Sequence, residues 1–469
     1  MRGSARLSVR RWLVAIGGVL LLGSAVGYSV HLWKKSVRRE AEEAVRAAAW
    51  PTASPSVVLV LLDTLRADRL GCYGYARATS PGLDSLAPEA VLFDNAYSQA
   101  PNTPPSIASI FTSLYPASHH FTGNNRLSEG AITLAECFAA AGYRTGGFVD
   151  SGYLRERFGM GQGFQTYDAA GGGFEAILPK AAAWARAEPG RPFFLLVHTY
   201  DIHTPYEETP LPYRDAFVQG NPSSDLTSED LEEIRTGKLV RTLTAEETRH
   251  FSDLYDGGIL HADALLANFL AGLRGDRLLD GAVLAITSDH GEEFMEHGSV
   301  LHEKLYRTVT HVPWILRLPG GEHGGLRVPE VVETIDLGPT LLAAAGVPAH
   351  DGMQGRNLLP HLAGEPLVDP QAVGQVTWDA EELGYYRGDR HLLLKPSASR
   401  LEMYDVRQDP LEQSNLAAGD PAAVGALGAA LTSRLEQASL RTYLRRGAES
   451  RAVLDPETEK SLRALGYVQ

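Results

Sequence analysis

Short runs of consecutive apolar residues recur along the chain, and each stops at a residue able to bind a metal or move a proton. The runs are Val57–Leu62, Phe193–Val197, Ala282–Ile286 and, more weakly, Gly146–Val149. The residues that follow them are Asp63, His198, the quartet Thr287-Ser288-Asp289-His290, and Asp150. Uninterrupted apolar runs this short are typical of strands that are buried on both faces of a parallel sheet.

Helix-like segments lie between these runs. Leu134–Ala141 is followed by Gly142, and Ala262–Leu273 is soon followed by Gly275, as expected at helix C-termini. Strands that alternate with helices predict an α/β fold, in which a mostly parallel sheet is flanked by helices on both faces. Such sheets bind ligands beyond the carboxyl ends of their strands. The acidic and histidine residues that end the apolar runs therefore mark one candidate site.

Asp63, Asp289 and His290 supply oxygen and nitrogen atoms that suit a divalent cation. A single Asp after a strand is as often a helix N-cap as a ligand, but several strands that end alike favour one shared site. We therefore predict one divalent metal ion, with Zn, Mn, Ca and Mg left open.

Composition and pattern divide the chain into five parts. These are 1–35, a membrane anchor or signal segment; 36–55, a linker; 56–365, the large α/β domain; 366–440, a C-terminal antiparallel subdomain; and 441–469, a helical tail. Two short strands on either side of Gly388-Asp389, with a third at Met403–Val406, predict a small antiparallel sheet. The polar stretch 207–250 is either an insertion over the substrate entrance or a solvated surface segment.

The N-terminal segment Trp12–Trp33 holds 22 residues without Asp, Glu, Lys or Arg. At about 1.5 Å per residue, such a helix spans the roughly 30 Å of a bilayer core. It predicts either an uncleaved anchor or a cleaved signal peptide. The corresponding locations are the cell membrane, with a single pass and an extracytoplasmic catalytic domain, or the periplasm or exterior.

Charge and cysteine content exclude several classes of protein. The 469-residue chain carries a net charge of −14, and residues 1–39 hold eight of its 43 basic residues and no acid. The remaining residues are therefore more acidic than the total indicates, which argues against a nucleic-acid partner. Two cysteines, Cys72 and Cys137, cannot form a disulfide framework or a cysteine-rich zinc module.

Several segments resemble the sulfatase family of the alkaline phosphatase superfamily, in the family's order. They are Val57–Asp68 (VVLVLLDTLRAD), Ala100–Pro116 (APNTPPSIASIFTSLYP), His198–Tyr206 (HTYDIHTPY), Thr287–Glu292 (TSDHGE), Val312–Ile315 (VPWI), Ile335–Leu341 (IDLGPTL), Leu401–Asp405 (LEMYD) and Asp409–Leu416 (DPLEQSNL). The resemblance implies a sulfatase-like catalytic domain over 56–365. It also implies a terminal helix at about Ala422–Ala438 that packs on the small C-terminal sheet.

The resemblance implies a role for individual residues. The metal ligands would be Asp63, Thr103, Asp289 and His290. The catalytic residues would be Thr103, as the nucleophile, with His203, His119, His302 and Lys304. The substrate-binding residues would be Ser106, His198 and Asp201.

The chain departs from the family at the nucleophile. Sulfatases carry a Cys or Ser that is oxidised to formylglycine, and this chain has Thr103, which that maturation does not accept. Threonine nucleophiles occur in relatives that act on phosphorus, where a divalent metal activates the hydroxyl. Ile107 replaces an arginine, and Thr64 replaces the second Asp of calcium sulfatases. The resulting ligand set favours Zn or Mn.

These observations predict a metal-dependent hydrolase of sulfate or phosphate esters that uses Thr103 as its metal-bound nucleophile. Its substrate would be a small-molecule, lipid or glycan ester, and the N-terminal segment would be its contact with the membrane. One alternative is a membrane-anchored phosphoryl-group transferase acting on envelope lipids or glycans. The other is a degenerate, non-catalytic binding protein, which the presence of Asp63, Asp289 and His290 argues against.

Overall fold

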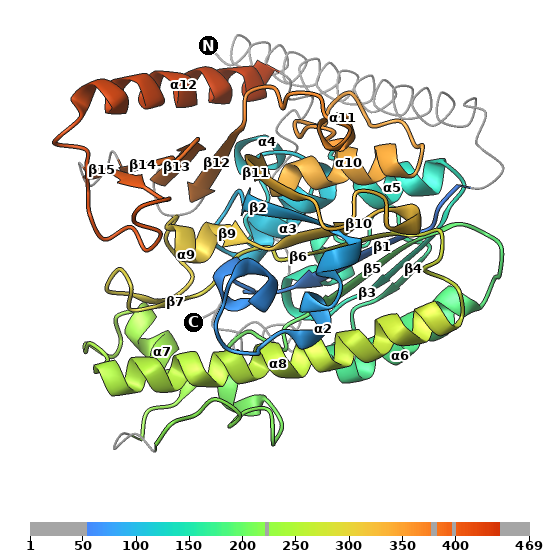
Figure 1. The fold of residues 1–469 in the computed structure, drawn as a ribbon, viewed down its shortest axis with the longest axis horizontal. Helices are drawn as coiled ribbons and strands as arrows, with labels where there is room; N and C mark the ends of the chain where they lie inside the picture. Colours follow the sequence, from blue (N-terminus) through green and yellow to red (C-terminus); the bar gives the residue numbers. More distant parts are fainter. Residues whose placement is uncertain (1–53, 221–224, 377–381, 396–399, 441–469) are drawn as a thin grey trace, which may run out of the picture. The chain divides into compact units, whose positions relative to one another are not determined.

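A nine-stranded sheet lies at the centre of the computed structural model, which describes residues 54–220, 225–376, 382–395 and 400–440 (Figure 1). Its strand order is β11-β2-β10-β6-β1-β5-β3-β4, and β9 pairs with β2 at one end. The bounds are β1 Val57–Leu62, β2 Val91–Tyr97, β3 Arg144–Phe148, β4 Thr166–Asp168, β5 Phe193–Thr199, β6 Val283–Thr287, β9 His311–Val312, β10 Trp314–Arg317 and β11 Arg327–Glu333. All four strands predicted from apolar runs are present, and they are neighbours in the order β6-β1-β5-β3.

Most neighbouring strands of this sheet run parallel, so the predicted fold class is confirmed. β1 is parallel to both β5 and β6, and β3 is parallel to β5. The antiparallel strand β10, which lies between β6 and β2, was not predicted. Apolar runs reveal burial but do not give the direction of a strand, so this reversal left no signal in the pattern.

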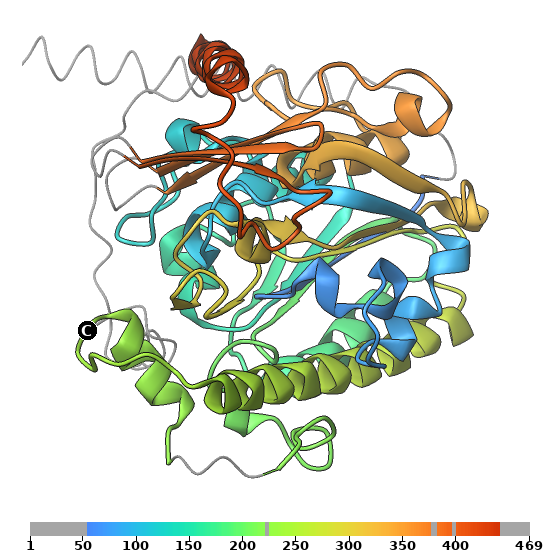
Figure 2. The same ribbon diagram turned by 60° about the vertical axis from the view of Figure 1, so that its left-hand side comes forward.

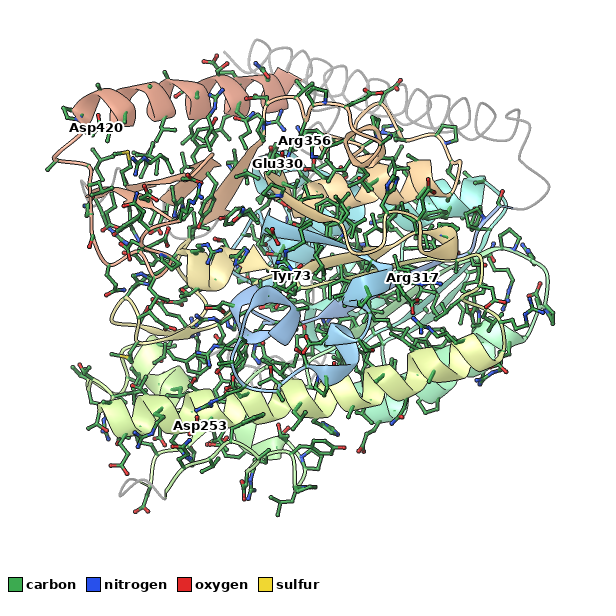
Figure 3. All side chains as sticks on the ribbon, in the orientation of Figure 1. Tyr73, Asp253, Arg317, Glu330, Arg356 and Asp420 are labelled. Atoms are coloured by element: carbon green, nitrogen blue, oxygen red, sulfur yellow. The ribbon has the colours of Figure 1, made fainter. Side chains whose placement is uncertain are left out.

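Alternating side chains of β1 enter two hydrophobic cores on opposite faces of the sheet. Val57, Leu59 and Leu61 belong to one core, whose helices are α3 (Thr103–Thr112), α5 (Leu134–Ala140) and α10 (Leu337–Ala344). The residues between them belong to the other, whose helices are α2 (Pro81–Asp84), α6 (Gly173–Arg186) and α8 (Ala245–Gly275). Side chains fill the space on both faces (Figure 3). Burial on both faces is why the strand is apolar at every position.

Helix α8 is far longer than the predicted segment Ala262–Leu273. It has 31 residues and begins with a capping box between Thr244 and Glu247. Its first half contains buried acidic residues, among them Asp253 and Asp256, which ion-pair with arginines. These buried charged residues hide the helix in the sequence. A search for periodic apolar residues treats every charged residue as exposed, so the buried face of the helix is not recognised.

The polar stretch 207–250 is not purely irregular. It contains α7 (Ser228–Arg235), which contacts β8 (Val300–Leu301), and it ends in the first residues of α8. β8 pairs with β7 (Glu293–Phe294) in a small hairpin that follows β6. The other short α-helices of the described residues are α4 (Pro116–His119), α9 (Arg307–Thr310) and α11 (Leu359–Leu362).

A four-stranded antiparallel sheet forms the C-terminal part, as predicted (Figure 2). Its strands are β12 (Gln371–Val376), β13 (Glu382–Arg387), β14 (Arg390–Lys395) and β15 (Arg400–Asp405), and α12 (Pro421–Leu440) follows them. Gly388, in the predicted turn, has φ of 57°, which glycine adopts without strain. Strand β12 was not predicted, because Gln371, Gly374 and Gln375 interrupt its apolar residues.

Both predicted terminal segments lie outside the described residues: the apolar stretch Trp12–Trp33 and the helical tail at 441–469. Among the helices that the structure describes, none is both long and apolar enough to cross a membrane. The boundaries predicted at 55/56 and 365/366 stay predictions.

Candidate active site

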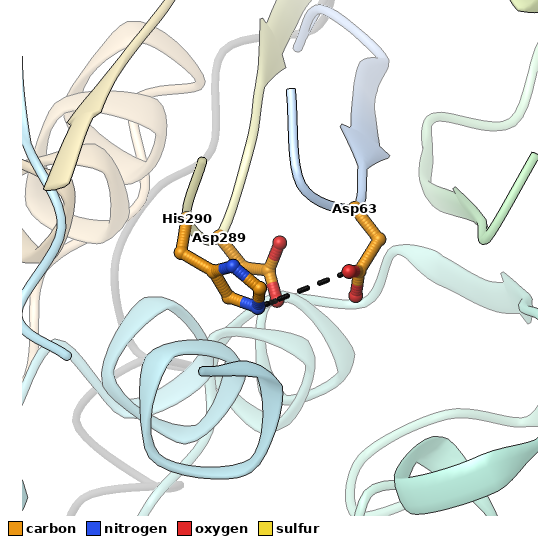
Figure 4. A group of neighbouring side chains, drawn as sticks. All are labelled: Asp63, Asp289 and His290. Carbon is orange, nitrogen blue, oxygen red and sulfur yellow. Dashed lines mark ion pairs between the residues drawn. The ribbon is translucent and has the colours of Figure 1, made fainter. Parts of the chain in front are cut away.

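The carboxyl ends of three adjacent strands bring the predicted ligands to one place. Asp63 follows β1, Asp289 and His290 follow β6, and His198 lies near the end of β5. The strand register places Leu61 beside Thr287 on one side and beside His198 on the other, so the three strand ends are level. Figure 4 shows the side chains of Asp63, Asp289 and His290 pointing into a common space.

These three residues have the donor set and spacing of a cation site. One ligand atom from each lies within 4.8 Å of the others. Asp63 Oδ1 and both carboxylate oxygens of Asp289 are buried without a hydrogen-bond partner among the described residues. Buried carboxylate oxygens are normally satisfied, so these unpartnered atoms indicate a ligand that the protein itself does not supply. The residues therefore fit a divalent cation.

The electrostatics of this group agree with that interpretation. Burial and the neighbouring Asp289 carboxylate raise the pKa of Asp63 well above its usual range. Burial alone would lower the pKa of His290, but the carboxylates of Asp289 and Asp63 outweigh it and raise that pKa. Two buried carboxylates side by side repel each other, and a cation between them removes the repulsion.

Thr103 lies against this group at the first turn of α3. Its hydroxyl donates to Asp63 Oδ2 at 3.1 Å, and its Oγ1 lies 3.2 Å from His290 Nε2. His290 Nδ1 donates to the carbonyl of Gly291 at 3.0 Å, which fixes the ring with Nε2 toward Thr103 and the two carboxylates. Pro104 and Pro105, which carry no N–H, follow Thr103 in the first turn, so the positive end of the α3 dipole rather than a set of N–H groups faces the site.

A second layer of residues borders the cluster. The His302 ring lies 4.4 Å from that of His290 and 5.1 Å from that of His203, measured between centroids. His203 Nδ1 donates to the carbonyl of Thr204 at 2.6 Å. Burial and the neighbouring His302 lower the pKa of His203 to about 3. Burial and His290 lower the pKa of His302 well below its usual range.

Glu292 lies behind these histidines, and the sequence assigned it no role. Its Oε1 is 3.0 Å from His302 Nδ1, and its Oε2 accepts from the Tyr206 hydroxyl at 2.9 Å. Burial raises the pKa of the fully buried Glu292 to about 7. One feature of the sequence could have indicated a role for Glu292: it lies two residues after His290, in the segment that follows β6.

The other predicted residues occupy different surroundings. His198 is fully buried beneath the cluster, with Nε2 3.4 Å from Asp63 Oδ2. Ser106 donates to the carbonyl of Ala100 at 2.9 Å and thereby supports the turn before α3. Asp201 Oδ2 accepts from the backbone N–H of Phe174, near the start of α6.

His119 and Lys304 are also engaged elsewhere. Phe121 N–H donates to His119 Nδ1 at 3.0 Å, and His119 Nε2 lies 3.1 Å from Ser109 Oγ on α3. Lys304 Nζ donates to the carbonyl of His297 at 2.8 Å. Of the five predicted catalytic residues, the structure thus brings Thr103, His203 and His302 around the three ligands.

The family model of the sulfatases matches residues 55–347, which is more than half of the chain and includes every element that carries the site. The chain belongs to the sulfatase family. The cattle (Bos taurus) arylsulfatase K is 25% identical over 82% of each chain. The arylsulfatase of Clostridium perfringens is also 25% identical, over 77% of this chain and 90% of its own.

The fold also resembles that of a solved phosphonate monoester hydrolase from Agrobacterium radiobacter. The TM-score is 0.69 at 19% identity, over 82% of this chain and 96% of the other. As a member of the sulfatase family, the chain is a hydrolase that acts on sulfuric or phosphoric ester bonds. The family usually binds a divalent metal, and Asp63, Asp289 and His290 are placed where they could hold one.

Proposed function

We propose that this enzyme hydrolyses phosphate, phosphonate or sulfate monoesters with Thr103 as its nucleophile and one divalent cation held by Asp63, Asp289 and His290. The observation that carries this proposal is the placement of Thr103 Oγ1, 3.1 Å from Asp63 Oδ2 and 3.2 Å from His290 Nε2. An N-capping threonine without chemistry would face solvent or the helix backbone, whereas Thr103 is fully buried among the ligands.

The residues of the chain define the course of the reaction. The hydrogen bond to Asp63 orients Thr103 Oγ1, which attacks the phosphorus or sulfur in line with the ester oxygen. A divalent cation, when bound, lowers the pKa of the hydroxyl and neutralises charge on the transferred group. The positive end of the α3 dipole favours the same negative charge. The bond from Oγ1 to phosphorus or sulfur forms as the ester bond breaks.

His302 and His203, which border the cluster, complete the reaction. His302 lies beside His290 and has a carboxylate partner, so we assign it both proton transfers: Nε2 takes the proton that Thr103 Oγ1 loses on attack and donates it to the departing oxygen. Water then attacks the esterified Thr103 and gives a proton to His302 Nε2, which passes it to Oγ1 as the free hydroxyl is released. His203, 5.1 Å from His302 between ring centroids, would contact oxygens of the substrate.

Phosphorus esters are favoured over sulfate esters, because Thr103 cannot become a formylglycine. The likeness to a phosphonate monoester hydrolase supports this choice, and the arylsulfatase relatives support aryl sulfates as competing substrates. Two carboxylates and one imidazole favour Zn or Mn over Ca. The apolar N-terminal segment supports an enzyme at the cell membrane or beyond it, with small-molecule, lipid or glycan esters within reach.

Activity measurements on the full-length protein test the nucleophile. The metal-free protein is reloaded with Zn, Mn, Mg or Ca and offered 4-nitrophenyl phosphate, sulfate, phenylphosphonate and a phosphodiester. We expect Thr103→Ala to lower kcat at least about 10³-fold, and Thr103→Ser to retain part of it. Mass spectrometry of the quenched enzyme should find a phosphoryl group on Thr103.

Thr112→Ala is the matched control. Thr112 is buried in the same helix, where its hydroxyl donates to the carbonyl of Ala108, and it lies a helix length away from the cluster. This variant should retain wild-type kcat. Full turnover by Thr103→Ala would refute the nucleophile, and absence of turnover with every metal and ester would refute the hydrolase itself.

A further inference from the structure

Helix α7 joins the two segments whose histidines border the candidate active site. At its start, the Ser228 hydroxyl accepts from the backbone N–H of Tyr206, three residues after the first histidine, at 3.0 Å. At its end, the Arg235 guanidinium ion-pairs with the carboxylate of Glu303, which directly follows the second histidine. The helix also contacts β8 of the β7–β8 hairpin (Figure 1). Through α7, the polar stretch 207–250 therefore lies beside the site.

Two carboxylates hold the Arg235 guanidinium, and they differ in exposure. Glu232, one turn earlier on α7, accepts from Nε at 2.6 Å and from Nη2, and Glu303 accepts from Nη1. The side chain of Glu232 is 25% exposed and that of Glu303 is 47% exposed. Water screens an exposed ion pair, so the bond to Glu303 contributes little to stability. Glu232 therefore fixes the guanidinium, whereas Glu303 can be exchanged for another anion.

The charge of Arg235 also reaches the start of α3. Burial raises the pKa of the Tyr153 hydroxyl, and the positive charge of Arg235 opposes that rise. Tyr153 lies beside the nucleophile segment, because a Cβ added to Gly123 would come within 2.7 Å of its ring and 2.9 Å of Pro104. Pro104 directly follows Thr103. Arg235 is therefore within electrostatic reach of the first turn of α3 while it is bonded to the segment after β8.

We propose that Arg235 is a specificity-determining residue, which binds an anionic group such as a carboxylate on the alcohol portion of the ester. The inference rests on the proposed function and defines its substrates as esters that carry a second negative charge. In a monoester, the alcohol portion is the part that extends away from the reacting phosphorus or sulfur. A guanidinium binds carboxylate, sulfate or phosphate oxygens through paired N–H groups. The substrate anion replaces Glu303 at Nη1, while Glu232 keeps the guanidinium in place.

A pair of matched esters tests this role on the full-length, metal-loaded enzyme. In 3-carbamoylphenyl phosphate, a neutral amide of similar size replaces the carboxylate of 3-carboxyphenyl phosphate. We expect Arg235→Gln to lower kcat/KM about 30-fold for the carboxyphenyl ester, mainly through KM, and less than about 3-fold for the carbamoylphenyl ester. Glu303→Gln removes the competing anion, so it should raise kcat/KM for the carboxyphenyl ester about 3-fold.

Arg214→Gln is the matched control. Arg214 lies in the same polar stretch, has a side chain that is 34% exposed and ion-pairs with Asp215 at 2.7 Å. Its substitution removes the same charge from the protein, so it reports any general effect of net charge on an anionic substrate. Arg214→Gln should leave the ratio of the two kcat/KM values unchanged. Equal losses with both esters in Arg235→Gln would overturn the inference, because a merely structural role of Arg235 in α7 does not distinguish the esters.

Binding without turnover keeps the inference separate from the proposed function. In 3-carboxyphenylphosphonate and 3-carbamoylphenylphosphonate, a carbon–phosphorus bond replaces the ester bond, and calorimetry gives the Kd of each. We expect the wild type to bind the carboxyphenyl compound about 10-fold more tightly, and Arg235→Gln to bind both alike. Equal Kd values in the wild type would overturn the inference. A wild type that shows this preference but hydrolyses no ester would refute only the proposed function.

Discussion

Asp289 illustrates the conflict between stability and function at a single residue. Both oxygens of its buried carboxylate lack a hydrogen-bond partner among the described residues, and Asp63 lies beside it. Because the two anions repel each other without a cation, we expect Asp289→Asn to stabilise the metal-free protein by about 1 kcal/mol. The same variant should lose most of the increase in Tm that Zn or Mn gives the wild type. Calorimetry with chelator and with added metal measures both effects.

Asp336 provides the comparison for this prediction. It is as deeply buried as Asp289, but its carboxylate ion-pairs with Arg356 at 2.6 Å and accepts from the backbone N–H of Glu333. Asp336→Asn should therefore destabilise the protein by roughly 3 kcal/mol with or without metal. A loss of stability in metal-free Asp289→Asn would contradict the assignment of Asp289 to a cation site.

His119 connects two elements, α4 and the nucleophile helix α3, and makes their packing sensitive to pH. It accepts from the Phe121 N–H and lies 3.1 Å from Ser109 on α3. Burial lowers its pKa from 6.5 to about 3, so the unfolded chain binds a proton more readily than the folded one. The contribution of His119 to stability is complete above pH 6.5 and is lost as the pH falls toward 3.

Urea unfolding at pH 7.5 and pH 5.0 measures this contribution. Between these values the wild type should lose about 2 kcal/mol of unfolding free energy through His119. His119→Gln, which can still hydrogen-bond to both partners, should lose correspondingly less. His120 is exposed and contributes less than burial to the lowered pKa of His119, so His120→Gln should keep most of the wild-type difference. An equal pH dependence in His119→Gln and the wild type would show that the α3–α4 contact does not involve a neutral His119.

The elements that could be predicted are those whose burial is uniform. β1 was predicted with its observed bounds, and the ends of β5, β6 and α5 were within two residues, because apolar runs and glycine stops mark them directly. The first half of α8 was missed, since its buried acidic residues are paired with arginines from distant segments. A pairing across the fold leaves no periodic signal in the sequence.

The same distinction holds within the site. Asp63, Asp289 and His290 could be brought together from the sequence, because parallel strands align their carboxyl ends at one edge. The contact between Glu292 and His302 could not, because it depends on how the β7–β8 hairpin folds back after β6. Neither the spacing nor the polarity of residues in the sequence indicates how the hairpin folds back. A local pattern therefore detects the three predicted metal ligands and misses the contact between Glu292 and His302.

Charge acts at the scale of the whole molecule. The chain carries −14 at pH 7, and every substrate of the proposed reaction is an anion. The net negative charge of the protein therefore repels the substrate at long range. The attraction by the bound cation and by the N-terminus of α3 acts only at short range. Added salt screens the long-range repulsion first, since the Debye length falls from about 30 Å at 0.01 M to about 10 Å at 0.1 M.

We therefore expect kcat/KM to rise over that range of ionic strength, and to rise more for a dianionic phosphate monoester than for a monoanionic phosphodiester. The metal is kept saturating, and choline chloride replaces NaCl in a parallel series to exclude a specific effect of sodium. Initial rates give the slope of kcat/KM against ionic strength for each ester. Because the protein is the same, the two slopes differ only through the substrate. A kcat/KM that falls with salt for both esters would mean that a local positive field reaches beyond the pocket and outweighs the acidic surface.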